Sequence, residues 1–194
     1  MDLNLYKSLE GDFATLNEIT VDDAEIIYKW RTGISGRYLN QPVGYSISFQ
    51  KEWIENRPNN EINYIISSRK SGVKVGMISI VGISEQNRNA EVGRLLLAPE
   101  YLTKSNPYGL ESIKICYDLV INKWKFNKIY GNILSENTKM LKLHKFLGMS
   151  EEGLLKEQTL IDGKFYDLFL VAIFRDALND SYIPKVNLLL KSFK

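Results

Sequence analysis

The sequence predicts an α+β (mixed α/β) domain in which helices flank a largely antiparallel sheet. The apolar patterns follow the order of one strand, two helices, three strands, a helix, a strand, a helix and two strands. Successive strands are separated by short turn signals at 69–72 and 161–163, which favour antiparallel hairpins. The length of 194 residues suits one domain with a full core.

The N-terminal segments read as one strand and two helices. Residues 13–19 alternate apolar and polar side chains, which is the pattern of a half-buried strand. Thr20 and Asp22 are N-cap candidates for a helix whose apolar side chains have helical spacing, and Gly33 ends that helix. Residues 48–56 carry large apolar side chains and predict a second, shorter helix.

The middle of the chain predicts three strands and a loop. The runs 62–68 and 73–83 are rich in strand-forming residues, and the turn signal at 69–72 joins them into a hairpin. Residues 89–98 form the next strand. Residues 99–108 are expected to be a polar loop.

The C-terminal part predicts helices and strands in alternation before a long hairpin. Residues 109–125 place apolar side chains on one helix face, and residues 128–134 form a strand. Residues 137–147 form a shorter helix. The segments 153–159 and 164–173 are expected to pair across an Asp-Gly turn.

Composition and charge exclude several kinds of site. A net charge of +2 is too small to indicate nucleic-acid binding. The single cysteine, Cys116, rules out an internal disulfide framework and, with one histidine, a structural zinc site. No apolar run reaches the length of about 18 residues that a membrane span needs, and the first residues lack a signal-peptide pattern. We therefore expect a cytoplasmic protein with no metal, no nucleic-acid partner and no membrane span.

No linker or repeat divides the chain. Residues 1–182 are therefore expected to form one domain, and residues 183–194 an amphipathic C-terminal tail that mixes apolar side chains with three lysines. Such a tail packs either on its own domain or on a second copy of the chain. The second alternative predicts a homodimer.

The order and spacing of these segments resemble the GNAT acetyltransferases, which transfer the acetyl group of acetyl-CoA to an amine. The resemblance covers roughly residues 13–178. The pieces that look like the branch of ribosomal-protein and spermidine acetyltransferases are Val21-Asp22-Asp23-Ala24, Trp30-Arg31, Glu152-Gly153-Leu154 and 162–167. The resemblance implies a GNAT-like central sheet, acetyl-CoA as cosubstrate and a small-molecule primary amine as acceptor. The alternative is an unrelated α+β domain with chance matches.

The resemblance also implies a strand and a loop that bind acetyl-CoA. The backbone at Leu96, Leu97 and Ala98 would hydrogen-bond the pantetheine arm. The loop 102–109 lies directly before a helix, where free N–H groups and the helix dipole suit a pyrophosphate. The family pattern Gln/Arg-x-x-Gly-x-Gly/Ala is missing there, and an ordinary surface turn is the alternative. The loop residues expected to contact the cosubstrate are Lys104, Asn106, Tyr108 and Gly109.

The helix 137–147 is the third expected contact with the cosubstrate. Asn137 is a good N-cap by type and position, and the resemblance implies that it also contacts the cofactor arm. Lys145 shares the helix with Lys139 and Lys142. These lysines either form a solvated face or attract the 3′-phosphate of the adenosine.

Two residues are candidates for proton transfer. His144, the only histidine, falls seven residues after Asn137, where most GNAT relatives have a tyrosine thought to protonate the departing thiolate. An imidazolium with a pKa of about 6.5 is able to protonate a thiolate whose thiol pKa is about 8.5. We therefore expect His144 to be a cofactor-contacting acid that titrates near neutrality. Glu91, at the start of its strand, is the candidate base for the attacking amine. A packing histidine and an ordinary strand-end glutamate are the alternatives.

The acceptor is expected to bind near the two early helices and the loop between them. Arg31, Tyr38 and Trp53 suit stacking on a ring and binding a phosphate, which allows a nucleotide-linked amino sugar. A protein N-terminus and a polyamine are the competing acceptors. A polyamine ranks lowest, because residues 31–53 offer only one carboxylate, Glu52. A GNAT-fold module that binds CoA without catalysis is a further alternative.

Overall fold

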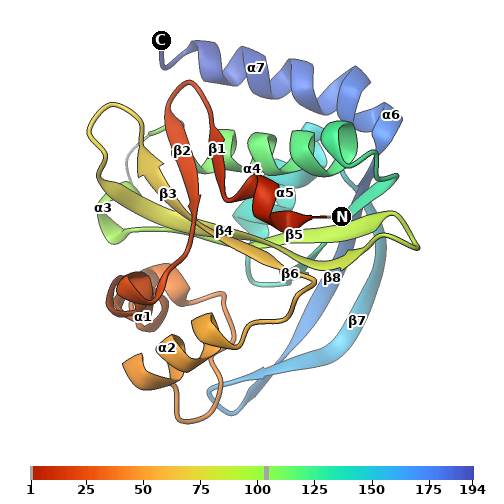
Figure 1. Cartoon of the computed structure of the whole chain (residues 1–194). Helices are drawn as coiled ribbons and strands as arrows, with labels where there is room; N and C mark the ends of the chain where they lie inside the picture. The colour runs from red at the N-terminus through yellow and green to blue at the C-terminus, as the bar shows by residue number, and fades with distance from the viewer. Residues whose placement is uncertain (1, 103–104) are drawn as a thin grey trace.

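A computed structural model of the chain describes residues 2–102 and 105–194, and its centre is an eight-stranded sheet (Figure 1). The strands are β1 (Ser8–Glu10), β2 (Ala14–Glu18), β3 (Ile62–Ser68), β4 (Lys74–Ser84), β5 (Asn89–Leu97), β6 (Lys128–Leu134), β7 (Ser150–Ile161) and β8 (Lys164–Phe174). The α-helices are α1 (Ala24–Thr32), α2 (Ile47–Glu55), α3 (Pro99–Leu102), α4 (Tyr108–Asp118), α5 (Thr138–Leu147), α6 (Arg175–Ala177) and α7 (Ile183–Lys191). Helices α4 and α7 lie on one face of the sheet, and α1 and α2 lie on the other.

The sheet has the strand order β1-β2-β3-β4-β5-β6-β8-β7. Neighbouring strands are antiparallel except β5 and β6, which are parallel. A parallel pair needs a crossover connection, and the segment containing α4 supplies it. The predicted α+β fold, with a largely antiparallel sheet flanked by helices, is therefore confirmed.

Most predicted segments lie close to the observed elements, and two differ for physical reasons. The strands predicted at 62–68 and 128–134 have those bounds. The prediction that 99–108 forms only a loop is wrong, because Pro99 starts α3, and proline is well suited to the first position of a helix. β1 has no predicted counterpart, since three residues are too few to show a periodic pattern.

The hairpin of β7 and β8 is longer than its sequence pattern indicates. The register of the two strands shifts between Glu151 and Gly153 and again between Leu155 and Thr159. Such bulges interrupt the alternation of inward and outward side chains, so the pattern covers only part of the strand. The predicted Asp-Gly turn is present: Asp162 has φ 49° and Gly163 has φ 77°, as a type I′ hairpin turn requires.

Apolar side chains form one core on each face of the sheet. The larger core packs the sheet against α4, α5 and α7, with Ile80, Cys116 and Val186 among its buried members. The smaller core packs the sheet against α1 and α2, with Ile27 and Met77 among its buried members. The two cores hold β5 between α4 on one side and α1 on the other, where the candidate site lies.

The C-terminal tail packs on its own domain. Val186 and Leu190 of α7 are buried, and Tyr182 stacks on Tyr117 of α4 with ring centroids 4.8 Å apart. The last residue, Lys194, pairs with Asp12 at 2.6 Å. Of the two alternatives for the tail, packing on its own domain is therefore the observed one, and the homodimer stays a prediction.

Candidate functional site

Strands β5 and β6 separate partway along their length. Among the described residues they pair only over 89–91 and 128–130, although β5 ends at Leu97 and β6 at Leu134. Beyond Glu91 the edge of β5 is therefore not paired with β6. An extended ligand that carries amide groups is able to hydrogen-bond to such an edge.

A cavity of about 450 Å³ opens where the two strands separate. Its walls come from β5 and β6, from α5, and from the segment 34–40 that follows α1. Apolar side chains form most of the wall, and a few polar groups converge on it, which is typical of a small-molecule site. The polar and charged lining residues used below are Arg37, Tyr38, Glu91, Arg94, Asn132, Asn137, Lys139 and His144.

His144 lines this cavity from α5 and is nearly fully buried. Its exposed fraction is 8%, and its Nδ1 is buried without a hydrogen-bond partner among the described residues. Burial lowers its pKa to about 4, so the ring is neutral at pH 7. The expectation of an imidazolium that titrates near neutrality is therefore wrong, because the sequence does not reveal desolvation. A buried nitrogen without a partner, on a residue that lines a cavity, is a candidate for a bond to a ligand's polar group.

The buried His144 predicts a loss of stability in mild acid. The unfolded chain binds a proton at this ring near pH 6.5, whereas the folded protein binds it only near pH 4. The contribution to the free energy of unfolding therefore decreases as the pH falls from 6.5 to 4, by about 3 kcal/mol. Urea unfolding across this range should show a flatter pH dependence for His144→Phe than for the wild type. Equal slopes for the two proteins would contradict the burial effect.

Glu91 lines the same cavity from β5, at the last residue paired with β6. Its Oε2 accepts a hydrogen bond of 2.9 Å from Nδ2 of Asn132 on β6. Burial raises the pKa of the Glu91 carboxyl, and the bond from Asn132 opposes that effect in part. A carboxylate with a raised pKa is a better proton acceptor than an ordinary one. His144 and Glu91, predicted separately, are therefore brought to one cavity.

Arg94 is a cavity residue that the sequence analysis does not single out. It has φ 52° at a register shift where β5 has one residue more than β4. Its Nη1 lies 3.2 Å from Oε2 of Glu61, and its guanidinium carbon lies 5.5 Å from the centre of the Trp53 ring. The available signal was a lone charge within the apolar run 92–97.

The residues predicted on the cofactor strand do not all line the cavity. Leu96 and Leu97 line the cavity. Ala98 is buried, and its N–H donates to the Val75 carbonyl at 2.8 Å, so that N–H serves the sheet. Lys104 lies outside the described residues.

Asn106, which precedes α4, is held between Tyr101 of α3 and Tyr108 of α4. Asn106 donates from Nδ2 to the Tyr101 carbonyl at 2.8 Å, and its Oδ1 accepts from the Tyr108 N–H at 3.3 Å. The ring of Tyr108 packs edge-on against Tyr101. Gly109 is buried, and a Cβ there would contact Leu97 at 3.5 Å. None of Asn106, Tyr108 and Gly109 lines the cavity. If these residues bind a phosphate, they bind it at the start of α4 and outside the cavity.

Besides His144, two more cosubstrate contacts are predicted at α5, Asn137 and Lys145, and only the first lines the cavity. Asn137 occupies the N-cap position, but its side chain makes no capping hydrogen bond, contrary to the expectation for that residue. It lines the cavity. Lys145 does not line the cavity, and its Nζ pairs with Glu151 at 2.6 Å and lies over the ring of Phe169.

Of the three residues predicted for the acceptor, Tyr38 alone lines the cavity. Arg31 lies behind the wall, where its Nε donates to Oε1 of Gln41 at 2.9 Å and its guanidinium lies over Tyr45. This contact ties α1 to the segment that contains Tyr38. Trp53 lies beneath Arg94 rather than on the wall. Arg31 and Trp53 are thus placed to support the wall.

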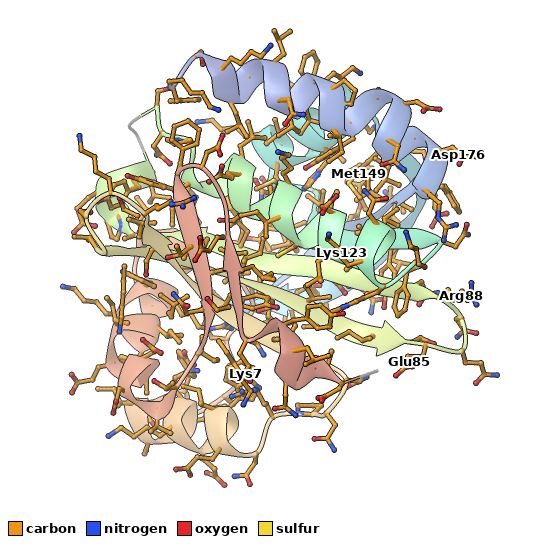
Figure 2. The ribbon with its side chains drawn as sticks, turned by 45° about the horizontal axis from the view of Figure 1, so that its top comes forward. Lys7, Glu85, Arg88, Lys123, Met149 and Asp176 are labelled. Carbon is orange, nitrogen blue, oxygen red and sulfur yellow. The ribbon has the colours of Figure 1, made fainter. Side chains whose placement is uncertain are left out.

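A second cavity, of about 360 Å³, shares no lining residue with the first. Figure 2 labels Glu85 and Arg88 at the β4–β5 hairpin and Lys123 in the segment that follows α4, and all three line this second cavity. Within 2–102 and 105–194, no three His, Cys, Asp or Glu side chains gather as metal ligands. In the same ranges no helix has the length and hydropathy that crossing a membrane requires.

Comparisons with known proteins match the chain to one family. The family model described as an acetyltransferase (GNAT) domain matches residues 14–150. The spermidine N(1)-acetyltransferase of Escherichia coli (strain K12) is 28% identical over 104 residues, which is 54% of this chain and 54% of that protein. An uncharacterized N-acetyltransferase of Bacillus licheniformis is 20% identical over 175 residues, or 87% of this chain and 97% of that protein. The chain spans about half the length of the Escherichia coli relatives it matches.

Solved structures share the fold. Spermidine N-acetyltransferase from Vibrio cholerae, in complex with CoA and spermine, superposes with a TM-score of 0.74 at 22% identity, covering 84% of this chain and 96% of that chain. A GCN5-related N-acetyltransferase from Brucella melitensis superposes with a TM-score of 0.74 at 14% identity, covering 88% and 80%.

Proposed function

This chain belongs to the GNAT acetyltransferase family, and on that premise we propose that it transfers the acetyl group of acetyl-CoA to a primary amine of a small molecule. The observation that carries the proposal is the cavity at the separation of β5 and β6, which has His144 and Glu91 on its walls. A buried imidazole and a carboxylate of raised pKa in one cavity suit a reaction that moves protons.

Three features suit the cosubstrate, two of them at the cavity and one at the start of α4. The free edge of β5 offers backbone groups to the amides of a pantetheine arm. Leu96 and Leu97 give an apolar wall. Helix α4 starts after Pro107; its Tyr108 N–H donates to Asn106, and the N–H groups of Gly109 and Leu110 that follow are candidates for a phosphate. Acetyl-CoA, when bound, supplies a thioester whose carbonyl carbon an amine is able to attack.

Glu91 and His144 have separate proposed roles. The acceptor ammonium gives one proton to Glu91, directly or through water, because only the free amine is nucleophilic. The N–C bond then forms and the C–S bond breaks, while the nitrogen loses one proton and the sulfur gains one. His144 is neutral and carries one N–H and one lone pair. Negative charge on the leaving sulfur would favour the protonated ring, so His144 is placed to hold that proton in transit.

For the acceptor we propose an amine attached to an anionic group, such as a nucleotide-linked amino sugar. Among the described lining residues three are cationic, Arg37, Arg94 and Lys139, and Glu91 is the only carboxylate. Tyr38 adds a ring on which a base or sugar is able to stack. A polyamine, which is positively charged, would be repelled by this wall.

A polyamine is nevertheless the second candidate, because several relatives carry the name spermidine acetyltransferase. Their similarity covers little more than half of either chain, so their acceptor does not transfer with the family. A protein N-terminus remains a third acceptor, and a module that binds CoA without catalysis is the non-enzymatic alternative.

The proposal is tested by measuring acetyl-CoA binding and CoA release separately. We expect calorimetry to show acetyl-CoA binding, and we expect CoA release to accelerate with a phosphate-bearing amino sugar more than with spermidine. Binding without release on phosphorylated amines, polyamines or peptide N-termini would identify a non-catalytic module. Release with spermidine above all others would make the polyamine the acceptor.

A further inference from the structure

Arg94 is held on the cavity wall by groups buried beneath it. Glu61 is 5% exposed at its side chain and lies 3.2 Å from Nη1 of Arg94. Asn63, fully buried, donates to Glu61 at 2.9 Å and accepts from Ser79 at 2.5 Å, and its Oδ1 lies 3.3 Å from Arg94. Trp53 packs against the guanidinium. These contacts fix both the Arg94 head group and the carboxylate under it.

The same arrangement makes one buried carboxylate, Glu61, unavailable to a cationic acceptor. Glu61 lies under Arg94, which already neutralises it, so Glu91 is the one carboxylate among the described lining residues that is left to meet a cation. Arg31 adds a further cation close by, since it donates to Gln41 and Asn40 and has no carboxylate partner among the described residues.

We propose that Arg94 determines acceptor specificity: it favours an amine that also carries an anionic group, and it excludes polyamines by covering Glu61. This inference rests on the proposed acetyl transfer and deepens it. A specific site often combines an attractive contact for the right ligand with a repulsive one for the wrong ligand. Arg94 would supply both, since its free edge attracts a phosphate and its charge repels an ammonium.

The test is a binding comparison that does not depend on turnover. Glucosamine 6-phosphate, glucosamine and spermidine are titrated calorimetrically into protein saturated with CoA. The wild type should bind the phosphate form at least tenfold tighter than glucosamine. Arg94→Gln should abolish that difference and bind spermidine about tenfold tighter than the wild type does, because Glu61 is uncovered. The double variant Arg94→Gln/Glu61→Gln should lose the gain in spermidine affinity.

Arg57→Gln is the matched control. Arg57 and Glu18 form another partly buried ion pair, and neither residue lines the cavity. This variant should keep the wild-type order of affinities, and thermal unfolding should show that each variant folds.

Two results would overturn the inference. One is a wild type that binds spermidine as tightly as the phosphate form. The other is an Arg94→Gln variant that weakens all three ligands equally, which would mark a structural role. A protein that fails to bind CoA or acetyl-CoA would contradict the proposed function itself, and the acceptor titrations repeated without CoA would still decide the role of Arg94.

Discussion

Replacing Glu91 by glutamine is expected to lower kcat at pH 7 by about a hundredfold or more. Glutamine keeps the shape of the side chain and an oxygen that is able to accept the bond from Asn132. It has no basic site for the ammonium proton, so only solvent would remain as acceptor. Steady-state kinetics with saturating acetyl-CoA would measure the loss.

The pH profile separates a base from a merely structural glutamate. Burial raises the pKa of Glu91, so in the wild type kcat/KM should fall on the acidic side at a midpoint above the ordinary carboxyl value. That limb should vanish in Glu91→Gln. Glu152→Gln is a suitable control, because Glu152 pairs with Lys128 and does not line the cavity. Near-normal turnover in Glu91→Gln would show that water alone removes the proton.

The second large effect is expected at His144. His144→Phe should lower kcat by roughly a hundredfold while acetyl-CoA affinity changes little, because the ring volume stays and the proton carrier is lost. His144→Tyr differs from His144→Phe only by a hydroxyl group. It should therefore recover much of the lost rate, since a phenol is able to donate a proton to sulfur.

This pair of variants also controls for packing. His144 is buried and shares the cavity wall with the apolar side chains of Met140 and Leu143, so both aromatic replacements occupy the same space. If Phe and Tyr variants were equally slow, or if His144→Ala kept near-normal turnover with saturating substrates, His144 would be a packing residue. A circular dichroism melt would show whether any loss comes from unfolding.

Much of the fold is predictable because its determinants are local. Alternation marks β2, strand-forming residues mark β3, helical spacing marks α4, and the Asp162-Gly163 turn sets the final hairpin through positive φ at both residues. The missed features have weak local signals. α3 spans four residues after an apolar strand, and the bulges of β7 hide its length.

The sequence identified several residues of the candidate site, but it did not reveal their burial or their protonation state. His144, Glu91, Asn137 and Tyr38 all line one cavity. Lys145 is predicted as a cofactor contact and instead pairs with Glu151, away from the wall. The helix pattern places both His144 and Lys145 on α5 but does not say which face meets the sheet.

The sequence by itself determined the order of the elements, the turns and the family resemblance, because periodicity and turn chemistry act over a few residues. Only the tertiary structure decided that His144 is neutral, since its pKa depends on burial by distant segments. It alone decided that Arg94 covers Glu61, which lies 33 residues away. Desolvation and long-range ion pairing are properties of the packed chain, and they set the charge that an acceptor meets.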